Sequence, residues 1–158
     1  MILVTGAAGK TGQAVVRALL AKGQTVRTLV RNETQCELMS SLYDTDIVIG
    51  DMSVESVLSN LFEGVRAVYH ICPNMHPDEL SIGQAMISAA KNADLTQFVF
   101  HSVLHSQVEA MPHHWQKMRV EEALFASGIP FTILRAAYLL KPSVDEKILN
   151  KSEKMNNG

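Results

Sequence analysis

The chain begins Met1-Ile2-Leu3-Val4-Thr5-Gly6-Ala7-Ala8-Gly9-Lys10-Thr11-Gly12, and this stretch decides its fold. Met1 to Val4 are apolar and typical of a strand, and an amphipathic helical stretch follows the glycines. A strand, a tight glycine turn and a helix start form a cradle in which unpaired amides point at one spot and the helix dipole favours negative charge. Glycines also let a pyrophosphate approach the backbone closely. The stretch therefore predicts a dinucleotide-binding turn.

The glycine spacing is Gly-x-x-Gly-x-x-Gly, whereas standard dehydrogenases carry Gly-x-Gly-x-x-Gly. A glycine triplet alone is weak evidence, because turns use glycine freely, and a merely structural turn is the alternative. The position favours binding, because the first strand-to-helix junction is where a Rossmann fold holds its phosphates. The residues expected to hold the cofactor here are Gly6, Ala8, Gly9, Lys10, Thr11 and Gly12.

A rival interpretation is a P-loop, because Gly9-Lys10-Thr11 resembles the end of that motif. A P-loop needs a glycine five residues before Gly9, and Val4 stands there. The stretch from Ile47 to Asp51 could pass for the acidic strand that holds magnesium in such enzymes. The same pattern occurs wherever a buried strand ends at the edge of a sheet, so the dinucleotide interpretation is favoured.

The composition indicates one ordinary globular domain. The chain has 158 residues, 47% of them hydrophobic and 19% charged, and its net charge is −2. There is no basic excess to suggest direct nucleic-acid binding, no apolar run of membrane-spanning length and no visible signal peptide. We therefore expect a cytoplasmic protein that does not bind membranes. Cys36 and Cys72 form no CxxC pair and are expected to be reduced thiols.

Strand-like and helix-like segments alternate, which predicts a parallel sheet with helices on both faces. The strands are expected at 2–5, 25–30, 46–49, 67–71, 97–101 and 131–134, the first five as buried central strands. The helices are expected at 12–22, 34–41, 54–62, 77–92 and 114–127, with Ser53 as an N-cap and with Asp78 and Glu79 in the first turn of the fourth. We predict a doubly wound, Rossmann-like α/β domain over 1–142 and a polar, frayed tail over 143–158.

Arg31 ends the second expected strand. There NAD enzymes place an acidic residue on the ribose 2′-hydroxyl, whereas NADP enzymes accommodate the 2′-phosphate with arginine. A guanidinium forks onto phosphate oxygens that a carboxylate would repel. We expect Arg31 to bind the 2′-phosphate of NADP(H), with Asn32 assisting, and NAD(H) to bind less well. A solvated surface arginine is the alternative.

Two further strand ends are expected at the same edge of the sheet. Asp51 could accept a hydrogen bond from the adenine amino group and Met52 could pack on the ring. Alternatively, Asp51 serves a helix N-terminal turn. Cys72 and Pro73 end the fourth strand, where the backbone commonly flanks the cofactor ribose. A catalytic Cys72 would need a low thiol pKa, and no partner is visible, so a buried structural thiol is expected.

The six histidines raise the alternative of a metal site. His101 and His105 lie at a strand end and in a loop, whereas the adjacent His113 and His114 diverge on a helix. No cysteine or carboxylate stands at ligand spacing, so we expect no metal.

A series of motifs runs along the chain in a characteristic order: Thr5-Gly6-x-x-Gly9-x-x-Gly12, Arg31, Gly50-Asp51, Ser102, Lys117, Glu121, Leu124, Ser127-Gly128-Ile129 and Thr132-Ile133-Leu134-Arg135. Over roughly residues 1–140 the chain thus resembles the NmrA-like group of atypical short-chain dehydrogenases/reductases. The glycine motif is shared by the whole superfamily, and the stretch from Ser127 to Arg135 is more specific. The resemblance implies a Rossmann-like fold that binds NADP(H).

In active short-chain reductases a Tyr-x-x-x-Lys pair does the acid/base work and a serine orients the carbonyl. The resemblance therefore assigns Lys117 to the nicotinamide ribose and Ser102 to the carbonyl, while His113 stands where the tyrosine is expected. His113 is a candidate general acid near neutral pH, and a polar helix cap is the alternative. Members of the family are usually about twice as long, so we expect most of the substrate lobe to be missing.

Two functions from different classes follow. One is an NADPH-dependent oxidoreductase, or its cofactor half, acting on a small carbonyl or quinone. The other is a non-catalytic NADP(H)-sensing protein that regulates a protein partner. Apolar surface left by the absent lobe suggests a homodimer.

Overall fold

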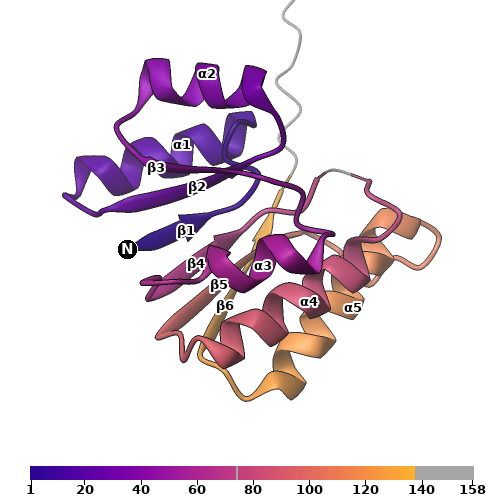
Figure 1. The fold of residues 1–158 in the computed structure, drawn as a ribbon. Helices are drawn as coiled ribbons and strands as arrows, with labels where there is room; N and C mark the ends of the chain where they lie inside the picture. Colours follow the sequence, from indigo (N-terminus) through magenta and orange to yellow (C-terminus); the bar gives the residue numbers. More distant parts are fainter. Residues whose placement is uncertain (74, 138–158) are drawn as a thin grey trace, which may run out of the picture.

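Strands and helices alternate along the part of the chain that this computed structural model describes, residues 1–73 and 75–137 (Figure 1). The strands are β1 (Ile2–Val4), β2 (Val26–Val30), β3 (Asp46–Ile49), β4 (Ala67–His70), β5 (Gln97–Val103) and β6 (Phe131–Ala136). The helices are α1 (Lys10–Ala21), α2 (Glu33–Leu42), α3 (Glu55–Leu61), α4 (Glu79–Asn92) and α5 (Pro112–Ser127). Each helix connects two strands, as the sequence predicts.

The strands form a parallel sheet with the order β3-β2-β1-β4-β5-β6. β1 lies in the interior, where Ile2 is paired with Val26 of β2 and with Ala67 of β4. The chain therefore winds outward from β1 first in one direction and then in the other. This order confirms the predicted doubly wound, Rossmann-like α/β fold and puts a topological switch point at the end of β1.

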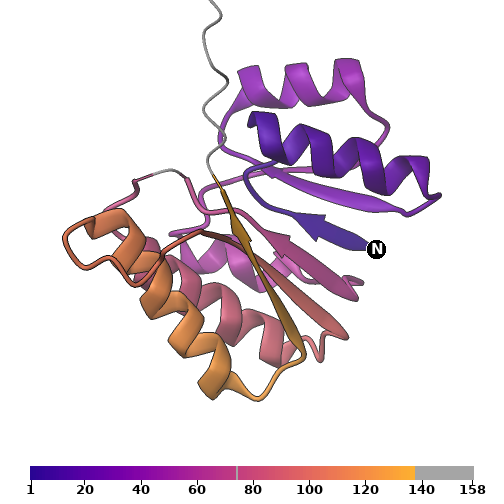
Figure 2. The same ribbon diagram turned by 180° about the vertical axis from the view of Figure 1, so that it is seen from behind.

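Helices cover both faces of the sheet, as Figures 1 and 2 show from opposite sides. α1 and α2 lie over one face, and α3, α4 and α5 lie over the other. Leu3 and Val4 point to opposite faces, yet both are fully buried. Leu3 joins the larger core cluster with α3–α5, and Val4 joins the smaller cluster with α1 and α2. An apolar run without alternation is what such a central parallel strand requires.

The expectation of a buried central strand is wrong for β3. This strand forms an edge of the sheet, and its end residues Asp46 and Ile49 are exposed. The apolar run Ile47-Val48-Ile49 did not reveal this position, because periodicity in one segment does not tell how many neighbouring strands it has.

Two strands extend beyond their predicted ends because they pair with each other. Ser102 of β5 pairs with Arg135 of β6, and Val103 pairs with Ala136. Ser53 is not an N-cap, because α3 begins after Val54 and has no capping side chain. The predicted domain boundary at 142 and the predicted tail lie outside the described residues. Among the helices described, none is long and apolar enough to cross a membrane.

Candidate cofactor-binding site

A cleft of about 610 Å³ opens at the switch point, where the turn after β1 meets the carboxyl ends of neighbouring strands. It brings together most of the site residues that the sequence predicts: Gly6, Ala8, Gly9, Lys10, Thr11, Gly12, Arg31, Met52, Cys72, Pro73, Ser102 and Lys117. The predicted residues Asn32, Asp51 and His113 are not among its lining residues. Among the described residues that line the cleft none is acidic, so the cleft offers its positive groups to an anion.

Two glycines are needed for the shape of the turn. Gly6 has a φ of +62°, and a Cβ there would lie 2.9 Å from the carbonyl oxygen of Ile71. A Cβ on Gly12 would overlap the backbone of Gly6 and Ala7. The turn therefore packs tightly against β4 on one side and against the start of α1 on the other, as expected for a dinucleotide-binding turn.

The start of α1 is left without a capping side chain. Its N-cap is Gly9, whereas Asn32 caps α2 by accepting a hydrogen bond from the amide of Gln35. The first amides of α1 lie where Lys10, Thr11 and Gly12 line the cleft. Unpaired amides at the positive end of a helix dipole are a suitable partner for a pyrophosphate. The local geometry thus fits the anionic part of a dinucleotide.

Arg31 lies at the end of β2, exposed and beside the cleft. Its amide donates to Oε1 of Gln35 at 2.9 Å, while no hydrogen bond or ion pair within the described residues engages its guanidinium. Gln35, in the first turn of α2, also lines the cleft. The sequence did not suggest it as a site residue. The side-chain oxygen of Asn32 is engaged in capping α2, and Asn32 is not a lining residue of the cleft.

The carboxylate of Asp51 accepts hydrogen bonds within its own turn. Its Oδ1 accepts hydrogen bonds from the amide and the hydroxyl of Ser53, at 2.8 and 2.6 Å, and these bonds lower the pKa of the Asp51 carboxyl. This is the turn arrangement that the sequence left open as an alternative. Met52, in contrast, is buried and lines the cleft.

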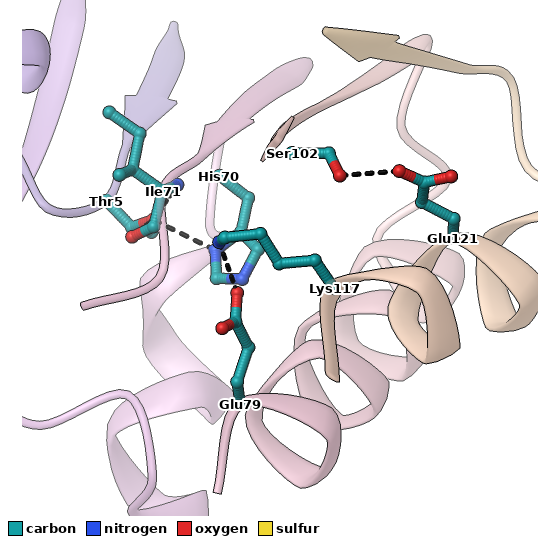
Figure 3. Close-up of polar contacts among 7 residues, drawn as sticks. All are labelled: Thr5, His70, Ile71, Glu79, Ser102, Lys117 and Glu121. Carbon is teal, nitrogen blue, oxygen red and sulfur yellow. Dashed lines mark hydrogen bonds and ion pairs between the residues drawn. The ribbon is translucent and has the colours of Figure 1, made fainter. Parts of the chain in front are cut away.

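Ser102 is buried, and its hydroxyl donates to Oε1 of Glu121 at 2.5 Å (Figure 3). Glu121 belongs to α5, and its carboxylate also receives the guanidinium of Arg135 from β6. The three side chains tie α5 to the sheet. The hydroxyl proton of Ser102 is therefore directed at α5, and it is not presented to a carbonyl in the cleft.

Lys117 forms a buried ion pair with Glu79. The ammonium lies 2.5 Å from Oε1 of Glu79 (Figure 3). It also lies 5.6 Å from the centre of the Phe100 ring, and Glu79 is completely buried. Burial raises the pKa of the Glu79 carboxyl, and the charge of Lys117 opposes that rise. The sequence had suggested only a helix-dipole role for Glu79, because nothing in its spacing links it to Lys117.

The close packing of two helices brings this ion pair together. A Cβ on Gly83 would lie 2.6 Å from a methyl group of Val120, so α4 and α5 approach closely at that point. Gly83 lies one helical turn beyond Glu79 on α4, and Val120 lies one turn beyond Lys117 on α5. The close approach at this glycine thus brings Glu79, at the start of α4, against Lys117 of α5.

A second buried polar group joins the ends of β1 and β4. The hydroxyl of Thr5 donates to the carbonyl of Ile71 at 3.1 Å and accepts from the amide of Ile71 at 2.9 Å. Nδ1 of His70 lies within hydrogen-bond distance of the same hydroxyl, at 2.9 Å. Burial, and then the charge of Lys117, lower the pKa of His70 to about 3, which keeps the ring neutral.

The two remaining catalytic candidates, Cys72 and His113, have no partner that would activate them among the described residues. Burial, with the charge of Glu79, raises the pKa of Cys72 to about 12, so this thiol is protonated at neutral pH. His113 lies in the first turn of α5 with its ring against that of His114, at 4.5 Å between centroids. Within residues 1–73 and 75–137, no group of three or more histidine, cysteine or acidic side chains could hold a metal ion.

The fold and the cleft define a Rossmann-type domain with a glycine turn and an uncapped helix start at its switch point. The sequence of residues 1–155 matches the model of the NmrA-like family. The chain therefore belongs to the NmrA-like family, as its motifs had indicated.

Relatives with different described roles resemble this chain. It is 31% identical to the photosystem II assembly factor Ycf39 of Cyanophora paradoxa, over 85% of this chain and 44% of that protein. It is 26% identical to quinone oxidoreductase 2 of Escherichia coli, over 85% of this chain and 48% of that protein. The chain thus spans about half the length of these relatives.

Solved structures share the fold. The NADPH complex of the NADPH-dependent quinone oxidoreductase QOR2 from Escherichia coli superimposes with a TM-score of 0.79, at 22% sequence identity. The match covers 98% of this chain and 55% of the other.

Proposed function

We propose that this chain binds NADP(H) in the cleft and forms the cofactor-binding part of an oxidoreductase that acts on a small carbonyl or quinone. The observation that carries the proposal is the uncapped start of α1 beside Arg31, whose guanidinium has no partner among the described residues, in a cleft to which those residues contribute no acidic side chain. A pyrophosphate and a 2′-phosphate are the two anionic groups that NADP(H) would bring to these positions.

The residues around the cleft suit the parts of such a cofactor. The amides of Lys10, Thr11 and Gly12 would hold the pyrophosphate, and Arg31 would hold the 2′-phosphate. Met52 offers an apolar surface for the adenine ring. Lys117 reaches the cleft from α5 and would donate to the hydroxyls of the nicotinamide ribose. The preference for NADP(H) over NAD(H) then depends on Arg31, since a guanidinium gains a charged partner only from the phosphorylated ribose.

The chemistry that the cofactor supplies when bound is hydride transfer to an electrophilic substrate. This chain contributes a fixed ammonium at Lys117 and a neutral ring at His70 beneath the cleft. Relatives named as oxidoreductases support this assignment, quinone oxidoreductase 2 among them. His113 remains the proposed proton donor, although it would have to move toward the cleft to reach a substrate.

A second function is a non-catalytic protein that senses NADP(H) and regulates a protein partner. The specific observation in its favour is that Ser102 is bonded to Glu121 and that His113 is not a lining residue, so the expected acid/base groups are not gathered. The relative named as an assembly factor supports this class of function.

A steady-state assay separates the two functions. The full chain is mixed with NADPH and with small quinones or aldehydes, and NADPH oxidation is followed by absorbance, with His113→Ala as the paired variant. Turnover that disappears in His113→Ala supports the oxidoreductase with His113 as its acid. Turnover that persists in the variant removes His113 from the mechanism. Saturable NADPH binding without turnover on either substrate class supports the sensor.

A further inference from the structure

The Glu79–Lys117 ion pair has an unusual relation to the cleft. Lys117 lines the cleft, whereas Glu79 does not, and the carboxylate is completely buried. Removing two charges from water is costly, and a buried pair of this kind is often no more stabilising than apolar residues of the same size. Stability alone is therefore a weak reason for placing a carboxylate here.

We propose that Glu79 is a positioning residue that keeps Lys117 charged and directed at the cofactor ribose, an inference that rests on the proposed binding of NADP(H). A lysine ammonium has three N–H donors, and the Glu79 bond at 2.5 Å uses one of them. The others remain for ligand hydroxyls. The carboxylate holds the ammonium from one side, and the ammonium lies over the Phe100 ring. These two contacts restrict the flexible lysine side chain, so it does not turn away from the cleft.

The surroundings make Glu79 the source of the balancing charge. The ion pairs of the described residues give Lys117 no other carboxylate. The charge of Lys117 acts on the pKa values of His70, Cys72 and His101, which come from β4, the segment after it and β5. His76 and His113 act on the pKa of Glu79 itself. Without Glu79, the nearly buried ammonium would have no carboxylate partner among the described residues, and burial favours its neutral form.

The sharpest test is Glu79→Gln, which keeps the shape of the side chain and removes its charge. NADPH affinity of the full chain is measured by calorimetry at pH 6.5, 7.5 and 8.5. Wild-type affinity should change little over this range. In the variant, affinity should fall with rising pH by up to about tenfold per pH unit, the dependence that one titrating group gives. A folded Glu79→Gln protein with the wild-type affinity and pH profile would overturn the proposal.

Two further variants keep the test decisive. Glu122→Gln is the matched control, because it removes one negative charge from an exposed pair with Arg119 on α5, and its NADPH affinity should be unchanged. Should Glu79→Gln not fold, Glu79→Asp replaces it. That variant keeps the charge but shortens the reach, so its affinity should drop without acquiring a pH dependence. Wild-type affinity in a folded Glu79→Asp protein would count against positioning.

A direct titration of Lys117 separates this proposal from the proposed function. The protein is labelled with ¹³C-lysine, and the Lys117 resonance is identified by its loss in Lys117→Arg. The proposal requires the pKa of Lys117 to fall in Glu79→Gln and to stay unchanged in Glu122→Gln. If wild-type protein does not bind NADPH, the cofactor assignment fails, but this titration still decides whether Glu79 controls the charge of Lys117. An unchanged Lys117 pKa would refute that control.

Discussion

The hydroxyl of Ser102 and the buried carboxylate of Glu121 are joined by a hydrogen bond of 2.5 Å. The bond links β5 to α5, and the same carboxylate holds Arg135 of β6. The family resemblance assigns Ser102 to a substrate carbonyl. In this structure its hydroxyl instead bonds to Glu121 and joins β5 to α5. The role of Ser102 can be tested through stability, independently of turnover.

Replacing Ser102 by alanine should destabilise the protein by about 1.5–3 kcal/mol, the usual range for hydrogen bonds to charged groups. The physical reason is that the buried carboxylate of Glu121 would lose one of its donors. The measurement is the free energy of unfolding in urea, with Ser59→Ala as control, because the Ser59 hydroxyl makes only an exposed bond to a backbone carbonyl. Equal, small effects of the two substitutions would contradict the tethering role.

Alanine substitutions at Gly9 and Gly12 should separate the shape of the turn from its binding surface. At Gly12 a Cβ would overlap the turn backbone, so we expect a loss of about 1–3 kcal/mol in unfolding free energy. At Gly9 the φ is −74° and the nearest atom to a Cβ is the Gly6 oxygen at 3.3 Å. Gly9→Ala should therefore cost less stability than Gly12→Ala and yet bind NADPH weakly. Undiminished NADPH binding by Gly9→Ala would argue against close approach of a pyrophosphate.

His70 should make the stability of the protein depend on acidity. Its pKa in the folded protein is about 3, below the 6.5 of an unperturbed histidine. The unfolded chain therefore takes up a proton as the pH falls below about 6.5, and the folded protein does not. The contribution of His70 to stability is complete above pH 6.5 and is lost toward pH 3, at about 1.4 kcal/mol per pH unit.

The check is a series of urea unfolding curves between pH 4 and pH 7 for wild type and His70→Asn. The difference between the two proteins should change with pH at that slope, because the asparagine does not titrate. His105→Asn is the control, since His105 lies exposed in a loop at a φ of +59° that asparagine tolerates. A wild-type curve parallel to that of His70→Asn would mean that His70 has the same pKa in the folded and unfolded protein, which would contradict the account.

The local signals in the sequence were sufficient for the fold and for one half of the site. Apolar runs such as Ile2-Leu3-Val4 predicted central strands, and the glycine turn identified the switch point, because both patterns lie within a few consecutive residues. Arg31 was found in the same way, from its place at the end of one strand. These features are fixed by neighbours in the chain, so the order of residues reveals them.

The other half of the site depends on contacts between distant segments. Glu79 meets Lys117 because α4 and α5 pack closely at Gly83, and Ser102 meets Glu121 because α5 lies over β5. No spacing in one sequence encodes such approaches. The edge position of β3 was missed for the same reason, since it depends on which strands pair across the sheet.

The central claim is that the cleft binds NADP(H) with Arg31 on the 2′-phosphate. The most direct measurement is calorimetric titration of the full chain with NADPH and, separately, with NADH, for wild type, Arg31→Glu and the exposed control Arg17→Glu. Wild type and the control should bind NADPH more tightly than NADH. Arg31→Glu should lose at least about tenfold in NADPH affinity, with little change for NADH, because only the phosphorylated ribose engages the guanidinium. Equal losses for both cofactors, or no binding of either by wild type, would contradict the account.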